Sequence, residues 1–180
     1  MSKKKIFIAV DTNSVSKAKK IIKETQTKKI KVGYKFGLEF FYSKDGRKFI
    51  SSLKNQTIFL DLKLNDIPNT IKSAIKSLKD LKISYLTVHL SSGLSALKAL
   101  KKESKNIRIA GVTTLTSLNN KDLKEIGYNK KVNELVKHQA KLATKAKLDA
   151  IVCSGHEIRS VRRVFKKEII TPGIKIHNTK

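Results

Sequence analysis

Three side chains capable of acid–base chemistry stand close together in residues 57–70, a segment that reads TIFLDLKLNDIPNT. Its apolar opening predicts a buried strand, and Asp61 and Lys63 come where that strand should end. Side chains two positions apart on a strand point to the same face, so this carboxylate and ammonium are expected side by side. Asp66 follows just beyond, before Pro68 stops the strand pairing. An ammonium fixed among carboxylates suits proton transfer, which makes the segment a candidate active site, with a surface salt bridge as the alternative.

The rest of the chain alternates short apolar runs with amphipathic runs, which predicts repeated strand–helix units and a parallel sheet. The expected strands are residues 6–10, 30–36, 57–62, 85–90, 107–114, 150–153 and 168–174. The expected helices are residues 14–24, 48–53, 69–78, 94–102, 133–145 and 156–165, with a polar loop at 115–120.

Two architectures satisfy this order, an open doubly wound sheet and a closed β/α barrel. The first strand is not followed by the G-x-G-x-x-G signature of a dinucleotide-binding sheet. Polar residues that would face one mouth of a barrel stand at or just after strand ends: Asp11, Lys35, Asp61, Lys63, His89, Thr116 and Ser117. That coincidence favours a (β/α)8 TIM barrel, of which this chain supplies about seven strands.

Length and composition indicate a single soluble, cytoplasmic domain over residues 1–180. A hydrophobic content of 39% with only 2 Pro and 8 Gly argues against disorder. Cys153 is the single cysteine, which excludes an internal disulfide and fits a reducing compartment. No run approaches the roughly 18 apolar residues that a membrane helix needs, and the first apolar run is too short for a signal peptide.

The formal net charge of +26, from 40 Lys+Arg against 14 Asp+Glu, would suit a nucleic-acid-binding protein. The excess is mostly lysine, however, and it is spread along the whole chain between apolar residues, as on solvated helix faces. Aromatic residues for base stacking are sparse, with 4 Tyr, 7 Phe and no Trp. We therefore expect no specific nucleic-acid partner, whereas anionic small molecules would be attracted to such a surface.

Five segments of the chain resemble the orotidine 5′-phosphate decarboxylase family, in particular its type 1 bacterial-like members. They are IAVD ending at Asp11, KFGLEFF beginning at Lys35, DLKLNDIPNT beginning at Asp61, VTTLTS ending at Ser117 and TPGIK ending at Lys175. Weaker support comes from VHLSSG and IVCS, and the likeness runs in the right order over essentially the whole chain. D-x-K-x-x-D alone is shared with sugar-phosphate decarboxylases, whereas the I-P-N-T that follows it here favours the nucleotide enzyme.

The resemblance implies a homodimeric barrel that converts orotidine 5′-phosphate to UMP and carbon dioxide in pyrimidine biosynthesis, without metal or organic cofactor. By motif match, Lys63 would be the proton donor, Asp61 would lie beside the substrate carboxylate, and Lys35 would link the charges and contact the ribose. Asp66 would reach into the partner subunit's site, and Asp11 would bind a ribose hydroxyl. The other substrate-binding positions implied are Ile67, Pro68, Asn69, Thr70, Thr116, Ser117 and Lys175.

Two lysines compete for the second-strand position in this pattern. Lys31-Val-Gly and Lys35-Phe-Gly both resemble the family's Lys-Val-Gly. The Leu-Glu-Phe-Phe-Tyr that follows and the spacing to Asp61 fit Lys35 better, and it is the preferred choice.

The resemblance also implies that the chain is truncated at its C-terminus. A (β/α)8 barrel usually takes about 250 residues, but the seventh expected strand ends close to Lys180. The family pattern would continue with a mobile loop over the phosphate and an eighth strand that ends in a Gly-Arg pair. We therefore expect a barrel without its last strand and helix, with an incomplete phosphate site and open edges at the first and last strands. Lys175 stands where the family usually has Arg, which keeps the charge and loses the planar fork.

Two other functions remain compatible with parts of the sequence. One is a related sugar-phosphate decarboxylase that uses D-x-K-x-x-D with magnesium, which a magnesium requirement would favour. The other is a basic, non-catalytic nucleic-acid-binding module, which a steep salt dependence of binding would favour. His89 is interpreted as structural rather than catalytic, and no histidine has metal-ligand spacing with Cys153.

Overall fold

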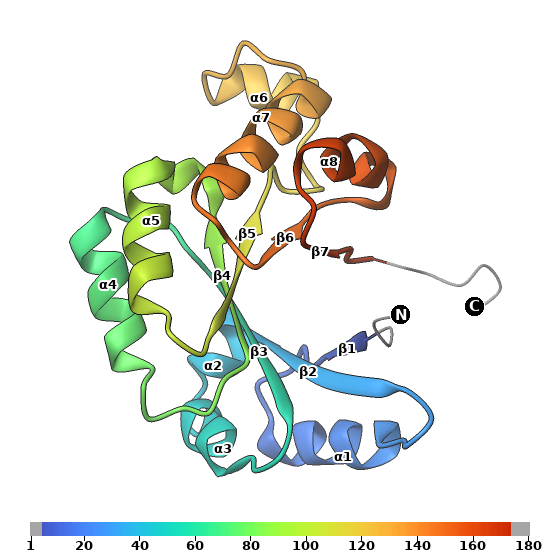
Figure 1. Cartoon of the computed structure of the whole chain (residues 1–180). Helices are drawn as coiled ribbons and strands as arrows, with labels where there is room; N and C mark the ends of the chain where they lie inside the picture. The colour runs from blue at the N-terminus through green and yellow to red at the C-terminus, as the bar shows by residue number, and fades with distance from the viewer. Residues whose placement is uncertain (1–4, 174–180) are drawn as a thin grey trace, which may run out of the picture.

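The computed structural model describes residues 5–173 and contains one sheet of seven parallel strands, which lie side by side in chain order. The strands are β1 (Lys5–Ala9), β2 (Lys31–Gly37), β3 (Thr57–Leu64), β4 (Tyr85–His89), β5 (Arg108–Val112), β6 (Ala150–Val152) and β7 (Glu168–Ile170). The sheet curls like part of a barrel wall, with the helices around its outside (Figure 1). The predicted β/α-barrel class with seven strands is confirmed.

The helices begin and end largely where local capping signals place them. They are α1 (Val15–Thr25), α2 (Leu38–Phe41), α3 (Gly46–Ser52), α4 (Pro68–Ser77), α5 (Gly93–Glu103), α6 (Asn120–Glu125), α7 (Val132–Lys145) and α8 (Ile158–Val164), with 3-10 turns η1 (Leu90–Ser92) and η2 (Gly155–Glu157). The Ser14 hydroxyl accepts the Lys17 N–H at 3.4 Å and so caps α1. Pro68 is the first residue of α4, where its missing N–H costs nothing.

The sequence does not predict α2 and α6, and it predicts too long a last strand. The short helix α2 has too few residues to show a helical period. The expected polar loop 115–120 gives way to α6 because Asn119 and Asp122 form a capping box, in which each side chain accepts the other's backbone N–H. The strand β7 ends at Ile170, shortly before Pro172, which has no N–H to offer a ladder.

Two layers of apolar side chains cover the two faces of the sheet. Strand residues that point outward, such as Phe36, Leu60 and Leu86, are fully buried in a core shared with the helices. The expected apolar stripe of α7, Leu135, Val136, Ala140 and Ala143, is buried there. A smaller cluster on the concave face contains only strand residues, Phe7, Phe59, Tyr85, Ala110, Ala150, Val152 and Ile170. Because strand side chains alternate between faces, a side chain on the concave face is positioned by the sheet alone.

A polar network at the amino ends of the strands connects the two edges of the sheet. Lys5 Nζ donates to the Tyr85 hydroxyl at 2.8 Å, and this hydroxyl donates to Glu168 Oε2 at 2.9 Å. Arg108 forms a 2.9 Å ion pair with the same Glu168 oxygen. Burial, together with Glu168, raises the pKa of Tyr85 to about 12, so the phenol stays a hydrogen-bond donor. Through Tyr85, β1 and β7 are linked across the concave face.

Both edges of the sheet are open in residues 5–173. There β1 pairs only with β2, and β7 pairs only with β6.

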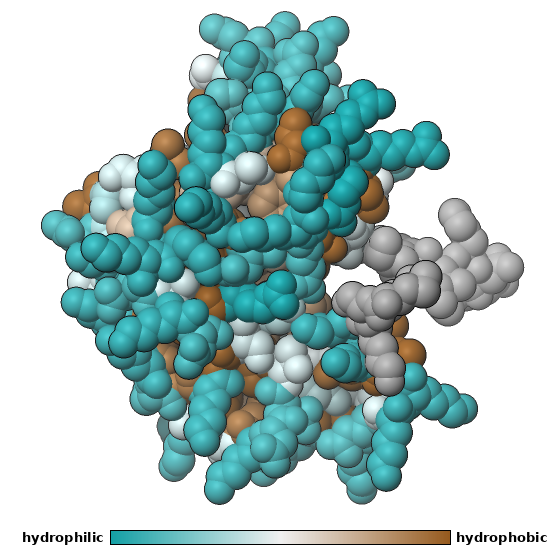
Figure 2. All heavy atoms as spheres, viewed as in Figure 1, coloured by the Kyte–Doolittle hydropathy of each residue, from teal (hydrophilic) through white to brown (hydrophobic). Residues whose placement is uncertain are grey.

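No helix in this part of the chain combines the length and the apolar character needed to cross a bilayer. Hydrophilic side chains cover most of the face shown in Figure 2, as expected for lysines spread along the whole sequence.

Replacing Tyr85 by Phe should destabilise the fold, because it removes the hydroxyl that accepts from Lys5 and donates to Glu168. The expected loss in free energy of unfolding is about 1–3 kcal/mol, measured by urea denaturation. Tyr42→Phe is the matched control, since Tyr42 is 76% exposed; its effect should stay within about 0.5 kcal/mol. Equal midpoints for the two variants would show that the network does not stabilise the sheet.

Candidate active site

Four charged side chains form a continuous row at the carboxyl ends of β1, β2 and β3. Lys63 Nζ lies 2.9 Å from Asp61 Oδ2, and Lys35 Nζ lies 3.6 Å from the same oxygen. Lys35 Nζ also lies 3.7 Å from Asp11 Oδ1, so cations and anions alternate along the row. We call Lys63, Asp61, Lys35 and Asp11 the charge row. The side chain of Asp61 is only 14% exposed, which makes its pairings stronger than those of a fully solvated surface pair.

The register of the parallel sheet explains why these side chains meet. Lys35 is paired with Ala9 of β1, two residues before Asp11, and Asp61 is paired with Gly37 of β2. Neighbouring strands lie about 4.8 Å apart, so a long lysine side chain on the middle strand can reach both flanking carboxylates. The competing Lys31 is exposed at the start of β2, where it pairs with Lys5 at the opposite end of the strands.

The backbone at Lys63 departs from a regular strand. Its φ angle is +47°, in the left-handed region that costs a non-glycine residue about 1–2 kcal/mol. The register between β3 and β4 shifts between Leu60 and Leu64, so Lys63 lies in a bulge. The ammonium is adjacent to Asp61 as expected, but simple strand alternation does not describe the geometry that puts it there.

Thr87, in the middle of β4, is a member of the site that sequence reasoning missed. It is fully buried. Its hydroxyl oxygen accepts the backbone N–H of Lys63 at 2.8 Å, and its hydroxyl proton is donated to Asp61 Oδ1 at 3.0 Å. A threonine within an apolar strand carries no signal of this role, since its β-branched side chain suits any strand.

His89 ends β4 beside the charge row and is half-buried. Burial lowers the pKa of this imidazole, and the nearby Lys63 ammonium lowers it further against the opposite effect of Asp61. Burial and the nearby cation therefore both favour the neutral form of the imidazole. Our interpretation of His89 as structural stays a prediction.

The segment that follows β3 is largely exposed. Asp66 is exposed, and its carboxylate accepts the backbone N–H of Ile67 at 2.7 Å. Within residues 5–173 it forms no ion pair with Lys63. Ile67 is 66% exposed, and Asn69 and Thr70 are exposed in the first turn of α4.

The remaining substrate-binding candidates lie on a loop or outside the described residues. Thr116 and Ser117 are exposed in the loop after β5. The buried Gln139 of α7 anchors the start of that loop, because its Oε1 accepts the Thr114 N–H at 2.7 Å. Lys175 lies outside the described residues.

No metal-binding group is present among residues 5–173, where no three His, Cys, Asp or Glu side chains cluster suitably. Cys153 is buried, and burial raises the pKa of its thiol to about 11, which makes it a poor nucleophile.

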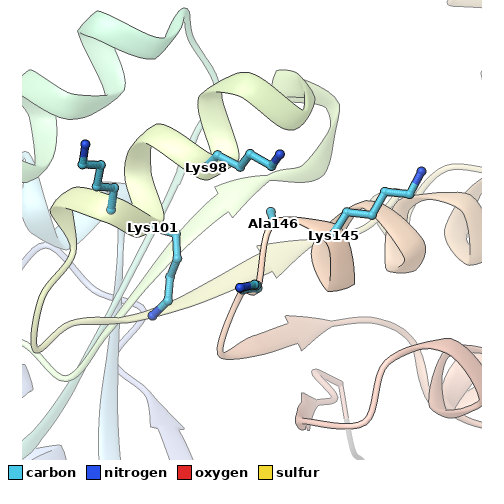
Figure 3. Close-up of a pocket in the computed structure, with 6 residues that line it drawn as sticks. Lys98, Lys101, Lys145 and Ala146 are labelled. Atoms are coloured by element: carbon cyan, nitrogen blue, oxygen red, sulfur yellow. The ribbon is translucent and has the colours of Figure 1, made fainter.

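A separate surface hollow of about 380 Å³ is lined by Lys98, Lys101, Lys102, Lys145, Ala146 and Lys147. Its lysines come from α5 and the end of α7 (Figure 3). Lys101 is paired with Asp149 at 2.6 Å. The ends of these helices lead into β5 and β6, so the hollow lies at the amino ends of the strands and is not part of the charge row.

The curled parallel sheet and the charge row at its carboxyl ends define a β/α-barrel protein whose site is built from lysines and aspartates. Residues 4–180 match the model of the orotidine 5′-phosphate decarboxylase / HUMPS family, and the chain belongs to that family.

Individual relatives support this assignment over most of the chain. The orotidine 5′-phosphate decarboxylase of Carboxydothermus hydrogenoformans is 37% identical, over 95% of this chain and 75% of its own length. The orotidine 5′-phosphate decarboxylase of Wolbachia pipientis subsp. Culex pipiens is 40% identical, over 96% of this chain and 77% of its own length. The crystal structure of orotidine 5′-phosphate decarboxylase from Lactobacillus acidophilus superposes with a TM-score of 0.80 at 28% identity, covering 94% of this chain and 81% of that one. The chain thus spans about three quarters of the length of the two curated relatives.

The lowered pKa of His89 predicts how stability depends on pH. Its ordinary value is 6.5, so at lower pH the unfolded chain takes up this proton more readily than the folded chain. The stability that depends on a neutral His89 is fully present above pH 6.5 and is lost as the pH falls through the lowered pKa of the folded state. His89→Gln should therefore flatten the fall in free energy of unfolding as the pH drops below 6.5, measured by urea denaturation. His138→Gln, at an exposed position on α7, is the matched control. An unchanged slope in the His89 variant would contradict the expectation.

Proposed function

We propose that this chain decarboxylates orotidine 5′-phosphate to UMP and carbon dioxide in pyrimidine biosynthesis, with Lys63 as the proton donor. The alternation of Lys63, Asp61, Lys35 and Asp11 within 3.7 Å contacts carries the proposal. The family match and the names of the relatives supply the substrate.

The reaction requires stabilisation of negative charge on a carbon atom. Loss of carbon dioxide from C6 of the pyrimidine leaves a carbanion that the ring carbonyls delocalise poorly. Without an organic electron sink, the protein must place a positive charge beside that carbon before the reaction begins. The Lys63 ammonium, fixed 2.9 Å from Asp61, is suited to this role and carries the proton that replaces carbon dioxide.

The other members of the row have complementary roles in this proposal. Asp61 orients Lys63 through their 2.9 Å ion pair, and it lies beside the substrate carboxylate, which leaves as neutral carbon dioxide. Lys35 is paired with both carboxylates, so it links Asp61 to Asp11 while its ammonium contacts the ribose. Asp11 is the most exposed of the four side chains and would accept a ribose hydroxyl proton in a hydrogen bond.

A homodimer accounts for the residues that a single chain leaves exposed. Asp66, Ile67, Asn69 and Thr70 are exposed around the start of α4, and Pro68 is half-buried there. In the proposed dimer, Asp66 enters the partner's site near its lysine, and the adjoining residues complete the substrate pocket. Thr116 and Ser117 contact the pyrimidine from the loop after β5, and Lys175 contributes charge for the phosphate.

Lys63→Ala should abolish turnover without unfolding the protein. The loss in kcat should be about 100-fold or more, because both the stabilising charge and the proton donor are removed. The assay is the ultraviolet loss of orotidine 5′-phosphate with a chelator present, alongside circular dichroism and thermal unfolding. Lys98→Ala, in the separate hollow, should keep the activity of the unmodified chain. Near-normal turnover by a folded Lys63→Ala variant would overturn the proton-donor role, and a magnesium requirement would overturn the cofactor-free mechanism.

The two lysines of β2 provide a second, internally matched test. Lys35→Ala should lower kcat/KM by about 10-fold or more, because Asp61 and Asp11 lose the cation between them. Lys31→Ala removes an exposed lysine from the other end of the same strand and should leave kcat/KM nearly unchanged. The reverse order of effects would reassign the second-strand lysine to Lys31.

A further inference from the structure

The hydroxyl of Thr87 connects the backbone of Lys63 to the carboxylate of Asp61. Thr87 lies on β4, whereas the two charged residues lie on β3, so the contact crosses between strands. The side chain is 0% exposed, which removes water as a competing partner. The Lys63 N–H lies 2.8 Å from the hydroxyl oxygen, and Asp61 Oδ1 lies 3.0 Å from it.

The direction of both hydrogen bonds is fixed by the chemistry of the three groups. A backbone N–H can only donate, and an ionised carboxylate can only accept. The hydroxyl must therefore accept from Lys63 and donate its single proton to Asp61. Its orientation is determined by the backbone on one side and the carboxylate on the other, and it has no free rotation left.

The bulge in β3 makes this hydroxyl necessary. The register between β3 and β4 shifts between Leu60 and Leu64, so regular ladder pairing is interrupted around Lys63. A buried N–H without an acceptor is strongly disfavoured, and Lys63 already has a left-handed φ of +47°. Thr87 supplies the acceptor that this unusual backbone conformation requires.

The same hydroxyl also fixes which way the carboxylate faces. Thr87 binds Oδ1 of Asp61, which leaves Oδ2 for Lys63 at 2.9 Å and Lys35 at 3.6 Å. Rotation of the carboxylate would break the hydrogen bond to Thr87. One hydroxyl thus holds Lys63 at two points. It binds the Lys63 backbone directly, and it positions the Lys63 ammonium through Asp61.

We propose that Thr87 is a positioning residue that holds the Lys63 ammonium and the Asp61 carboxylate in their reactive arrangement before substrate binds. This inference rests on the proposed decarboxylase function. Thr87 itself is buried beneath the charges and acts through Lys63 and Asp61. Preorganised charge is effective because no reorganisation is needed during the reaction.

Thr87→Val and Thr87→Ser form a matched pair for the test. Valine keeps the branched shape and removes the hydroxyl, whereas serine keeps the hydroxyl and removes the methyl group. Thr87→Val should lower kcat about 10- to 100-fold with a smaller change in KM, because the proton donor is misplaced. Thr87→Ser should recover most of kcat. If the valine variant fails to fold, Thr87→Cys replaces it. Its thiol is a weak hydrogen-bond partner, so kcat should again fall.

A second readout does not depend on turnover. Amide hydrogen exchange, followed by NMR without substrate, reports whether the Lys63 N–H keeps its acceptor. Exchange at Lys63 should accelerate about 10-fold or more in Thr87→Val and stay slow in Thr87→Ser. The Ile109 amide, which is bonded to Asp149 at 2.9 Å, monitors global stability and should be unaffected.

The two readouts separate the two proposals. Absence of turnover in the unmodified chain, with the exchange pattern as expected, would overturn the decarboxylase function and leave the structural linkage in place. Wild-type kcat in Thr87→Val, or unchanged exchange at Lys63, would overturn the positioning role. Equal acceleration at Lys63 and Ile109 would also overturn it, since it would reduce Thr87 to a general stabilising residue.

Discussion

The sharing of one carboxylate by a hydroxyl and two ammonium groups is the interaction on which the site depends. Asp61 accepts the Thr87 hydroxyl on one oxygen, and its other oxygen lies 2.9 Å from Lys63 and 3.6 Å from Lys35. A largely buried carboxylate is costly to maintain without such partners, and two nearby ammonium groups repel each other without the carboxylate between them. Each member of the cluster is therefore stabilised only when the others are in place, and the pattern of charges is set before any substrate arrives.

The fold separates this reactive cluster from a structural one at the other end of the same concave face. At the amino ends, Lys5, Tyr85 and Glu168 satisfy one another and connect the first strand to the last. An apolar layer that includes Phe7 and Phe59 lies between the two ends and is packed edge to face. At the amino ends Lys5 and Arg108 converge on the single carboxylate of Glu168, whereas the charge row alternates two lysines with two aspartates and stays partly exposed where a ligand could enter. A shared sheet thus supports two polar clusters with different purposes.

Sequence reasoning was accurate where the signal is local. The alternation of apolar runs predicted seven strands in the right places, and Asp61 and Lys63 marked the carboxyl end of β3. It was inaccurate where a long-range partner decides the outcome. The bulge at Lys63 depends on the register of β4 against β3, and the hydroxyl that supports it belongs to Thr87, 24 residues further along the chain. No periodicity in either strand reports such a contact.

The sequence by itself determined the fold class, the strand that carries the acid–base pair and the family to which the chain belongs, because these follow from residue type and spacing along the chain. The sequence favoured Lys35 over Lys31, but only the tertiary structure shows that Lys35 lies between Asp11 and Asp61, because strand register places one lysine at each end of β2. The tertiary structure also shows that the Asp66 carboxylate is exposed and bonded to the backbone N–H of Ile67. Residues far apart in the chain become neighbours only through the parallel sheet, and the alternation of charges exists only in three dimensions.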